Sequence, residues 1–239
     1  MDKRGKKYFL NEGVDFQSDL GIIDKDLIAN AQIGDTLKTH LDHDFKVVKA
    51  NINDFIELMD RRCSILVKKD IGSVLAHTGL GSGSNVVDAG TGAGAICLNF
   101  ANVVGNDGMV YSYEIREDFA KIASKNIEKF GLKNIVIKNK DIKEGIDEEN
   151  LDLIFLDLPK PYEIFEGVYE SLNFGGWLAV YAPYIDQAEI AYKVAKKLNF
   201  ENIDIIETIE RGIEVKTQGT RPKTRMVGHT GYLVFARKL

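Results

Sequence analysis

Small residues and glycines follow a short apolar segment near the middle of the chain, in a pattern that suits the binding of a nucleotide-like ligand. Val86 and Val87 lead to Asp88, and the sequence A-G-T-G-A-G-A follows from residue 89 to residue 95. Glycines let the chain turn with positive φ angles, and they let a ligand approach backbone N–H groups without meeting a Cβ. Because the spacing also fits the dinucleotide fingerprint G-x-G-x-x-G/A, a nicotinamide cofactor and S-adenosylmethionine are both candidates at this point.

Acidic residues follow four segments that have the pattern of strands, namely Asp88, Glu114, Asp141 and Asp157. Ligands of open α/β sheets bind at the carboxyl ends of the strands, so these side chains should surround one site. Glu114 comes about twenty residues after the glycines, which suits hydrogen bonds to ribose hydroxyls. Asp88 places negative charge where a pyrophosphate would lie, which repels a dinucleotide and attracts a sulfonium group. Asp141 can accept from an adenine amino group while Ile142 packs on the ring, so the four acids favour S-adenosylmethionine.

Asp157 lies in the sequence L-D-L-P-K-P-Y, from Leu156 to Tyr162. An acid followed by two rigid prolines and an aromatic ring fits the wall of a pocket for a planar substrate that carries an amine. A carboxylate there can accept a hydrogen bond from that amine and orient the ring. Asp157 is therefore the candidate catalytic residue.

Strands and helices alternate after residue 86, which predicts an α/β fold with a mostly parallel sheet covered on both faces. The expected strands are Met109–Ile115, Ile135–Ile137, Leu151–Leu158, Trp177–Ala182, Ile203–Glu210 and Tyr232–Ala236, and the expected helices are Glu117–Phe130, Glu163–Leu172 and Asp186–Leu198. Residues 212–230 read as a long polar loop.

The chain before residue 86 predicts two further parts. Residues 1–50 contain short extended pieces, which predicts a small N-terminal β-barrel-like domain. Residues 51–85 predict a helical connecting segment, with one helix from Asn53 and another opening near Asp70 as its cap. Residues 86–239 would then form the catalytic domain that binds S-adenosylmethionine.

The composition is that of an ordinary globular protein, with 239 residues, 44% hydrophobic and 28% charged residues and a net charge of −5. No apolar run approaches membrane-spanning length, and we expect a cytoplasmic protein without a membrane partner. Two cysteines and four histidines show no metal-ligand spacing, so no metal site is expected. The acidic charge argues against binding duplex DNA over the whole surface but allows local basic patches. Two basic clusters stand out, one at Lys3, Arg4, Lys6 and Lys7, the other at Arg221, Lys223 and Arg225.

Several longer motifs carry a family resemblance that runs nearly from end to end of the chain. They are D-A-G-T-G-A-G-A (88–95), Y-E-I-R (113–116), L-D-L-P-K-P-Y (156–162), Y-A-P-Y-I-D-Q (181–187) and R-P-K-T-R-M-V-G-H-T-G-Y-L-V-F-A-R (221–237). The chain resembles the tRNA (adenine-N1)-methyltransferases that modify the T-loop, of the homotetrameric bacterial and archaeal type.

The resemblance implies a class I methyltransferase (Rossmann-like) domain with a seven-stranded sheet behind a small β-domain. It implies methylation of adenine N1 at tRNA position 58, with position 57 as a further target, by an enzyme that assembles as a homotetramer. It assigns the catalytic carboxylate to Asp157. The implied donor-binding residues are Gly90, Gly92, Ala93, Gly94, Ala95, Glu114, Asp141, Ile142 and Asp157, and the implied RNA-binding residues are Arg221, Lys223, Arg225 and His229.

Two other functions stay open on the sequence. One is methylation of a small molecule or a protein carboxyl group, which would need no RNA. The other is a noncatalytic subunit that binds tRNA, although such subunits lose the glycine loop that this chain keeps.

Overall fold

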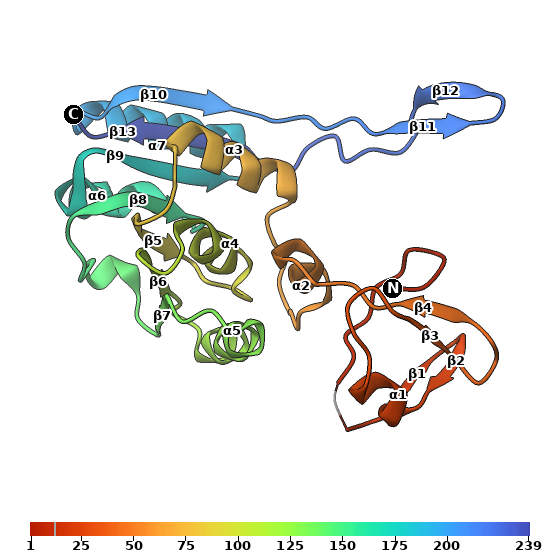
Figure 1. Ribbon diagram of the computed structural model, residues 1–239. Helices are drawn as coiled ribbons and strands as arrows, with labels where there is room; N and C mark the ends of the chain where they lie inside the picture. The colour runs from red at the N-terminus through yellow and green to blue at the C-terminus, as the bar shows by residue number, and fades with distance from the viewer. Residues whose placement is uncertain (12) are drawn as a thin grey trace. The chain divides into compact units, whose positions relative to one another are not determined.

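The computed structural model describes residues 1–11 and 13–239, which divide into two compact units, Met1–Met59 and Asp60–Leu239 (Figure 1). The first unit holds two short antiparallel hairpins, β1 (Phe16–Ser18) with β2 (Gly21–Ile23) and β3 (Thr36–Lys38) with β4 (Asp44–Lys46). Helices α1 (Lys25–Ala29) and α2 (Ile52–Leu58) complete it. Its small core is built from Ile23, Ile28, Leu37 and Phe45.

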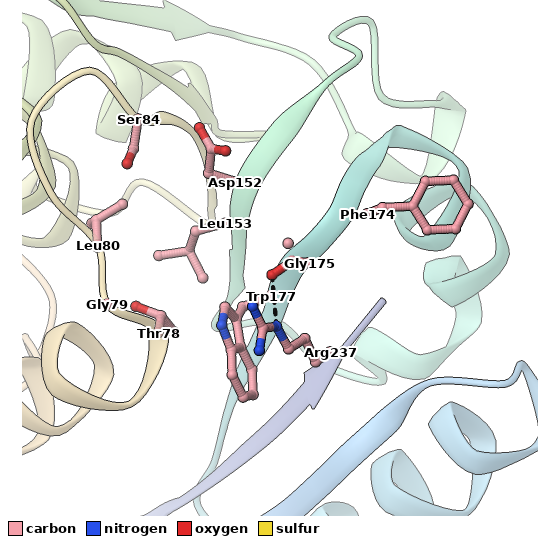
Figure 2. Close-up of a pocket in the computed structure, with 11 residues that line it drawn as sticks. Thr78, Gly79, Leu80, Ser84, Asp152, Leu153, Phe174, Gly175, Trp177 and Arg237 are labelled. Carbon is pink, nitrogen blue, oxygen red and sulfur yellow. Dashed lines mark hydrogen bonds between the residues drawn. The ribbon is translucent and has the colours of Figure 1, made fainter. Parts of the chain in front are cut away.

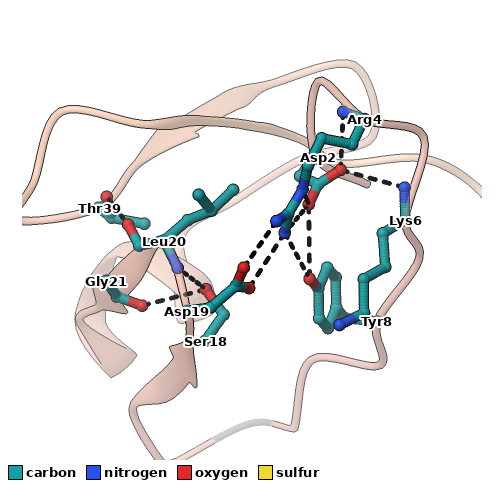
Figure 3. A network of polar contacts seen from close by, with 9 residues as sticks. All are labelled: Asp2, Arg4, Lys6, Tyr8, Ser18, Asp19, Leu20, Gly21 and Thr39. Carbon is teal, nitrogen blue, oxygen red and sulfur yellow. Dashed lines mark hydrogen bonds and ion pairs between the residues drawn. The ribbon is translucent and has the colours of Figure 1, made fainter.

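A buried carboxylate organises the N-terminal segment of this unit (Figure 3). Asp2 accepts hydrogen bonds from the backbone N–H groups of Arg4 and Lys6 and from the Arg4 guanidinium. Arg4 also forms an ion pair with Asp19 at 2.6 Å, and this hydrogen-bonded pair lowers the pKa of Asp19 to about 2. Lys7 likewise pairs with Glu57 at 2.7 Å. Two cations of the first predicted basic cluster are thus held by carboxylates within the unit.

The second unit is built on a seven-stranded sheet, which confirms the predicted number of strands, and their order is β10-β13-β9-β8-β5-β6-β7. Its strands are β5 (Asn85–Ala89), β6 (Met109–Tyr113), β7 (Ile135–Lys138), β8 (Leu151–Leu156), β9 (Leu172–Ala182), β10 (Glu201–Ile206) and β13 (Tyr232–Arg237). Within this sheet β13 runs antiparallel to both of its neighbours and the other pairs are parallel. The strand order reverses between β5 and β8, where open sheets of this type bind ligands.

Helices cover both faces of the sheet, and alternating side chains of β8 divide the core between them. Ile154 and Leu156 pack in the cluster formed with Phe165 of α6, whereas Phe155 packs on Phe100 of α4, with ring centroids 5.7 Å apart. The helices are α3 (Lys68–Thr78), α4 (Ala95–Val104), α5 (Glu117–Phe130), α6 (Phe165–Ser171) and α7 (Ile185–Lys197), with 3-10 turns η1 (Ile142–Glu144) and η2 (Pro161–Ile164). None of the described helices is both long and apolar enough to cross a membrane.

The structure corrects several predicted elements. The predicted loop 212–230 contains a hairpin of β11 (Ile213–Lys216) and β12 (Gly219–Pro222). Its period-2 pattern is short and its residues are mostly exposed, so the polar composition concealed it. The N-terminal unit contains α1, where only strands were expected, because Asp24 caps that helix. The predicted connecting segment 51–85 is divided, since α2 belongs to the first unit and α3 to the second.

The prediction that Asp70 caps α3 is wrong. The helix has Val67 at its N-cap position, so Asp70 lies inside the first turn and is 1% exposed. Its carboxylate accepts from Lys69 at 2.6 Å and from Thr230 at 2.8 Å. The bond from Thr230 is tertiary and links α3 to the residues just before β13, which a local capping pattern cannot reveal.

Candidate active site

A cavity of about 380 Å³ lies at the carboxyl ends of β5, β6 and β8. Three of its walls come from segments predicted from the sequence, namely the glycine loop, the residues from Glu114 onward and the residues from Asp157 onward. The fourth wall is the segment from Cys63 to Leu66, which the sequence analysis did not identify. The fold therefore brings two of the four predicted acids, Glu114 and Asp157, into the lining of one cavity.

The glycine loop leaves room for a ligand because its glycines have no side chains where the loop comes close to other parts of the protein. Gly92 and Gly94 have φ angles of +55° and +92°, which other residues rarely adopt. A Cβ on Gly92 would lie 3.2 Å from Sγ of Cys63, and one on Gly90 would lie 3.7 Å from Oε2 of Glu114. Gly94 is the N-cap of α4, so the free N–H groups of this helix begin beside the cavity. This cradle fits a nucleoside ligand.

Glu114 is fixed by two backbone donors at the end of β6. The N–H of Gly92 donates to Oε2 at 2.8 Å, and the N–H of Arg116 donates to Oε1 at 3.0 Å. Only 8% of the residue is exposed. Each carboxylate oxygen can accept a further hydrogen bond, so the group can also bind a ribose diol. Its position matches the prediction from its spacing after the glycines.

Asp88 lies beneath the glycine loop and is completely buried. The Ser112 hydroxyl donates to Oδ2 at 2.6 Å, and Thr91, which lines the cavity, lies 2.7 Å from the same hydroxyl. Oδ1 has no hydrogen-bond partner among the described residues. Burial, followed by the negative charges of Asp157 and Glu114, raises the pKa of Asp88 to about 7. A positively charged ligand in the cavity would stabilise the ionised form of Asp88 and lower its pKa.

Asp157 is fixed to the glycine loop through its backbone. Its N–H donates to the carbonyl of Ala89 at 2.5 Å, and its carbonyl accepts from Gly90 at 3.3 Å. The residue lines the cavity and keeps some contact with solvent, but protein atoms surround much of its carboxyl group. The resulting loss of hydration raises the pKa of its carboxyl to about 6. The group is therefore mostly ionised at pH 7 and available as an acceptor.

The structure places the other predicted donor residues differently. Asp141 accepts from the N–H of Lys143 at 2.9 Å and caps η1, while Ile142 is buried in the main core. Neither lines the cavity, nor does Gly94, so their contacts with a donor stay a prediction.

The predicted RNA-binding residues lie outside the cavity lining, around the hairpin. Arg221 pairs with Glu214 at 3.4 Å, and Lys223 and Arg225 are exposed. His229 is bound through Nδ1 to Glu207 at 2.6 Å and through Nε2 to the carbonyl of Pro183 at 3.0 Å. The hydrogen bond to Glu207 is the main cause of the raised pKa of His229.

Two features that the sequence analysis missed shape the site. The side-chain amide of Asn126 donates to the carbonyl of Asp60 at 2.8 Å and to that of Ala93 at 2.9 Å, which ties the 60–66 segment to the glycine loop. Ile115 lines the cavity and is 65% exposed. An apolar residue directly after Glu114 could have been identified from the sequence as a candidate wall of the cavity, whereas nothing local marks Asn126.

A second cavity, of about 270 Å³, lies at the opposite, amino ends of β5 and β8 (Figure 2). Arg237 donates to the carbonyl of Gly175 at 2.9 Å and lies over the ring of Trp177. Asp152 accepts from the N–H of Asn85 at 2.8 Å. Because these polar groups are satisfied within the protein, the cavity offers a ligand little to bind.

The seven-stranded sheet with an antiparallel β13, together with the glycine loop and the acid at the end of β6, defines a class I S-adenosylmethionine-dependent methyltransferase. The sequence profile of the tRNA methyltransferase complex GCD14 subunit matches residues 54–221. The chain belongs to this family.

Curated relatives and solved structures agree with this assignment. The tRNA (adenine(57)-N(1)/adenine(58)-N(1))-methyltransferase TrmI of Methanocaldococcus jannaschii is 39% identical over 99% of this chain and 93% of the relative. The structure of tRNA (m1A58) methyltransferase TrmI from Aquifex aeolicus superposes with a TM-score of 0.80, at 27% identity, over 96% of this chain and 90% of that chain. A SAM-dependent O-methyltransferase from Thermotoga maritima gives a TM-score of 0.91 at 32% identity, over 100% and 91% of the two chains.

The raised pKa of Asp88 predicts a pH-dependent effect of the Asp88→Asn substitution on stability. A carboxyl whose pKa is higher in the folded state stabilises the fold at low pH, and that contribution is lost as the pH rises through about 7. The free energy of unfolding of the variant, relative to the wild type, should therefore increase between pH 5 and pH 8 by roughly 1–3 kcal/mol, since one pKa unit corresponds to about 1.4 kcal/mol. Urea denaturation of the ligand-free proteins measures this difference. Asp186→Asn, at an exposed site, controls for the loss of one negative charge, and a difference independent of pH would contradict the account.

Proposed function

We propose that the protein transfers a methyl group from S-adenosylmethionine to N1 of adenine in the T-loop of tRNA, at position 58 and also at position 57. The observation that carries this proposal is the 39% identity over 99% of the chain to a relative whose name specifies both positions. The acids around the cavity support it, because they suit a cationic donor and an acceptor base that carries an amine.

Residues of the glycine loop and Glu114 would hold the nucleoside part of the donor. Backbone N–H groups and the Glu114 carboxylate provide the hydrogen bonds, and Ile115 provides an apolar surface. S-adenosylmethionine supplies an electrophilic methyl group on a positively charged sulfur. The negative potential of Asp88, Glu114 and Asp157 favours a cation in this cavity.

Asp157 would position the adenine and stabilise the charge that develops on it. Adenine N1 has a lone pair in the plane of the ring and needs no base to remove a proton before it attacks a methyl group. Positive charge then develops on the ring, and the ionised Asp157 can accept a hydrogen bond from the exocyclic amine. Positioning and electrostatic stabilisation would therefore supply most of the catalysis. Because N1 is engaged inside a folded T-loop, the base must leave its stack, at a cost of a few kcal/mol.

Binding of tRNA by this acidic chain requires local basic surface. We propose that Arg221, Lys223, Arg225 and His229 contribute to it, and that several copies of the chain combine their patches in a homotetramer. The exposed hairpin supports an assembly, since Ile213 is 54% exposed and Val215 is 78% exposed. An isolated two-stranded hairpin is marginally stable in water, so a partner that covers these apolar side chains would stabilise it.

Methylation of an oxygen on a small molecule is a second candidate, because the Thermotoga maritima structure is described as an O-methyltransferase. That function would require turnover with the donor when no RNA is present. The site itself favours nitrogen as the acceptor, since Asp157, with a pKa of about 6, is a weak base for an alcohol.

The role of Asp157 predicts a selective loss of catalysis in the Asp157→Ala variant. We expect kcat for unmodified tRNA to fall by about 10²–10³-fold, as for other losses of a transition-state hydrogen bond. Asp157→Asn keeps an acceptor oxygen without the charge and should give a smaller loss. Transfer of tritiated methyl groups to tRNA measures the rates, and calorimetry with S-adenosylmethionine serves as the control, since the affinity for the donor should fall much less than kcat. Unchanged turnover of the alanine variant would exclude the catalytic role of Asp157. A wild-type protein that methylates a small molecule but not tRNA would favour the second candidate.

The exposed hairpin predicts that Val215→Lys weakens the assembly, because a charge would be buried in the interface. Light scattering after gel filtration should give the wild type four times the chain mass of 26.7 kDa and give the variant a smaller mass. Thr217→Lys, in the turn of the same hairpin, is the matched control. A wild-type protein that elutes as a single chain would contradict the tetramer, and a Val215→Lys protein of unchanged mass would exclude the hairpin as its interface.

A further inference from the structure

Two adjacent arginines come directly before the cavity wall and have no role in the site as described above. Arg61 and Arg62 are exposed, and they precede Cys63, the first residue of the 63–66 wall. Neither forms an ion pair or hydrogen bond with another described residue through its side chain. Consecutive Cα atoms are about 3.8 Å apart, so both backbones lie within about 8 Å of Cys63. They therefore lie close to one edge of the cavity, although neither lines it.

The backbone at this point is held in a fixed position relative to the glycine loop. Asn126 is 2% exposed, and its amide joins the carbonyl of Asp60 to the carbonyl of Ala93. Leu66, at the other end of the segment, is buried. The arginines are thus carried by a segment anchored on both sides, so they can act at a defined place at the cavity mouth.

The charge of the cavity explains why cations are needed there. Glu114 and Asp157 line the cavity, and the buried Asp88 interacts electrostatically with both, so the site favours a cationic donor but repels the phosphates of an RNA. Arg116, a cation that lines the cavity, is already paired with Asp118 at 3.2 Å. Arg61 and Arg62 are left to interact with an external anion.

We propose that Arg61 and Arg62 bind phosphates of the tRNA on either side of the nucleotide whose base enters the cavity. This inference rests on the proposed function, because it assigns RNA contacts to the same site. Guanidinium groups suit the task, since they form paired hydrogen bonds with phosphate oxygens. These contacts lie beside the reacting base, whereas the hairpin residues lie outside the cavity lining.

The test compares Arg61→Ala/Arg62→Ala with Lys196→Ala/Lys197→Ala. The control removes two exposed cations from the last turn of α7 that pair with no described residue, so both variants change the net charge equally. We expect the arginine variant to raise the KM for tRNA at least tenfold at 0.15 M salt, with kcat at saturating tRNA and the Kd of S-adenosylmethionine unchanged. The slope of log Kd for tRNA against log salt should become shallower by about 1–2, because each lost phosphate contact contributes about 0.7–0.9. Arg61→Lys/Arg62→Lys should recover most of the affinity.

The possible results separate this inference from the proposed function. If the arginine variant follows the lysine control, or if its main defect is weaker donor binding, the phosphate contacts are excluded and the segment serves only as a wall. If the wild type fails to methylate tRNA, the proposed function fails. A wild type that methylates tRNA, together with an arginine variant of normal KM, overturns this inference alone.

Discussion

The convergence of carboxyl groups on one cavity is the constraint on which the rest of the site depends. Asp88 is buried, and one of its oxygens has no hydrogen-bond partner in the part of the chain that the structure describes. The charges of Asp157 and Glu114 add to the loss of hydration in raising its pKa. Such a cluster is unfavourable in an empty pocket and favourable around a cation. The affinity for a sulfonium donor and the repulsion of RNA phosphates thus have the same origin, which is why cations at the rim matter.

The sheet produces this convergence through its topology. The order of strands reverses between β5 and β8, so the loop after β5 and the start of the segment after β8 lie side by side, joined by the bonds between Ala89, Gly90 and Asp157. Successive side chains of β8 point to opposite faces of the sheet and are buried under helices on both sides. Polar groups are therefore left at the ends of the strands. Packing on both faces therefore holds the acids in position.

The sequence was sufficient to predict the sheet, the glycine loop and the positions of Glu114 and Asp157. The sheet depends on the local periodicity of apolar residues, and the other features follow from their place directly after a strand. It did not predict the 63–66 wall or the Asn126 bridge, since these contacts join residues that are far apart in the chain. Asp70 fits a cap pattern, but its carboxylate accepts a tertiary hydrogen bond from Thr230 instead. Asp141 and Ile142 follow a strand, as expected. Asp141 caps a 3-10 turn, however, and Ile142 is buried in the core.

Proton release on ligand binding tests the account most directly, because it reports the charge of the cavity itself. Calorimetry at pH 7 in buffers of different ionisation enthalpy would compare S-adenosylmethionine with S-adenosylhomocysteine, which lacks the positive charge on sulfur. We predict that S-adenosylmethionine releases more protons, since a cation lowers the pKa of Asp88 from about 7 and that of Asp157 from about 6. Equal release by the two ligands, or greater release by S-adenosylhomocysteine, would contradict an acidic cavity built around a sulfonium donor.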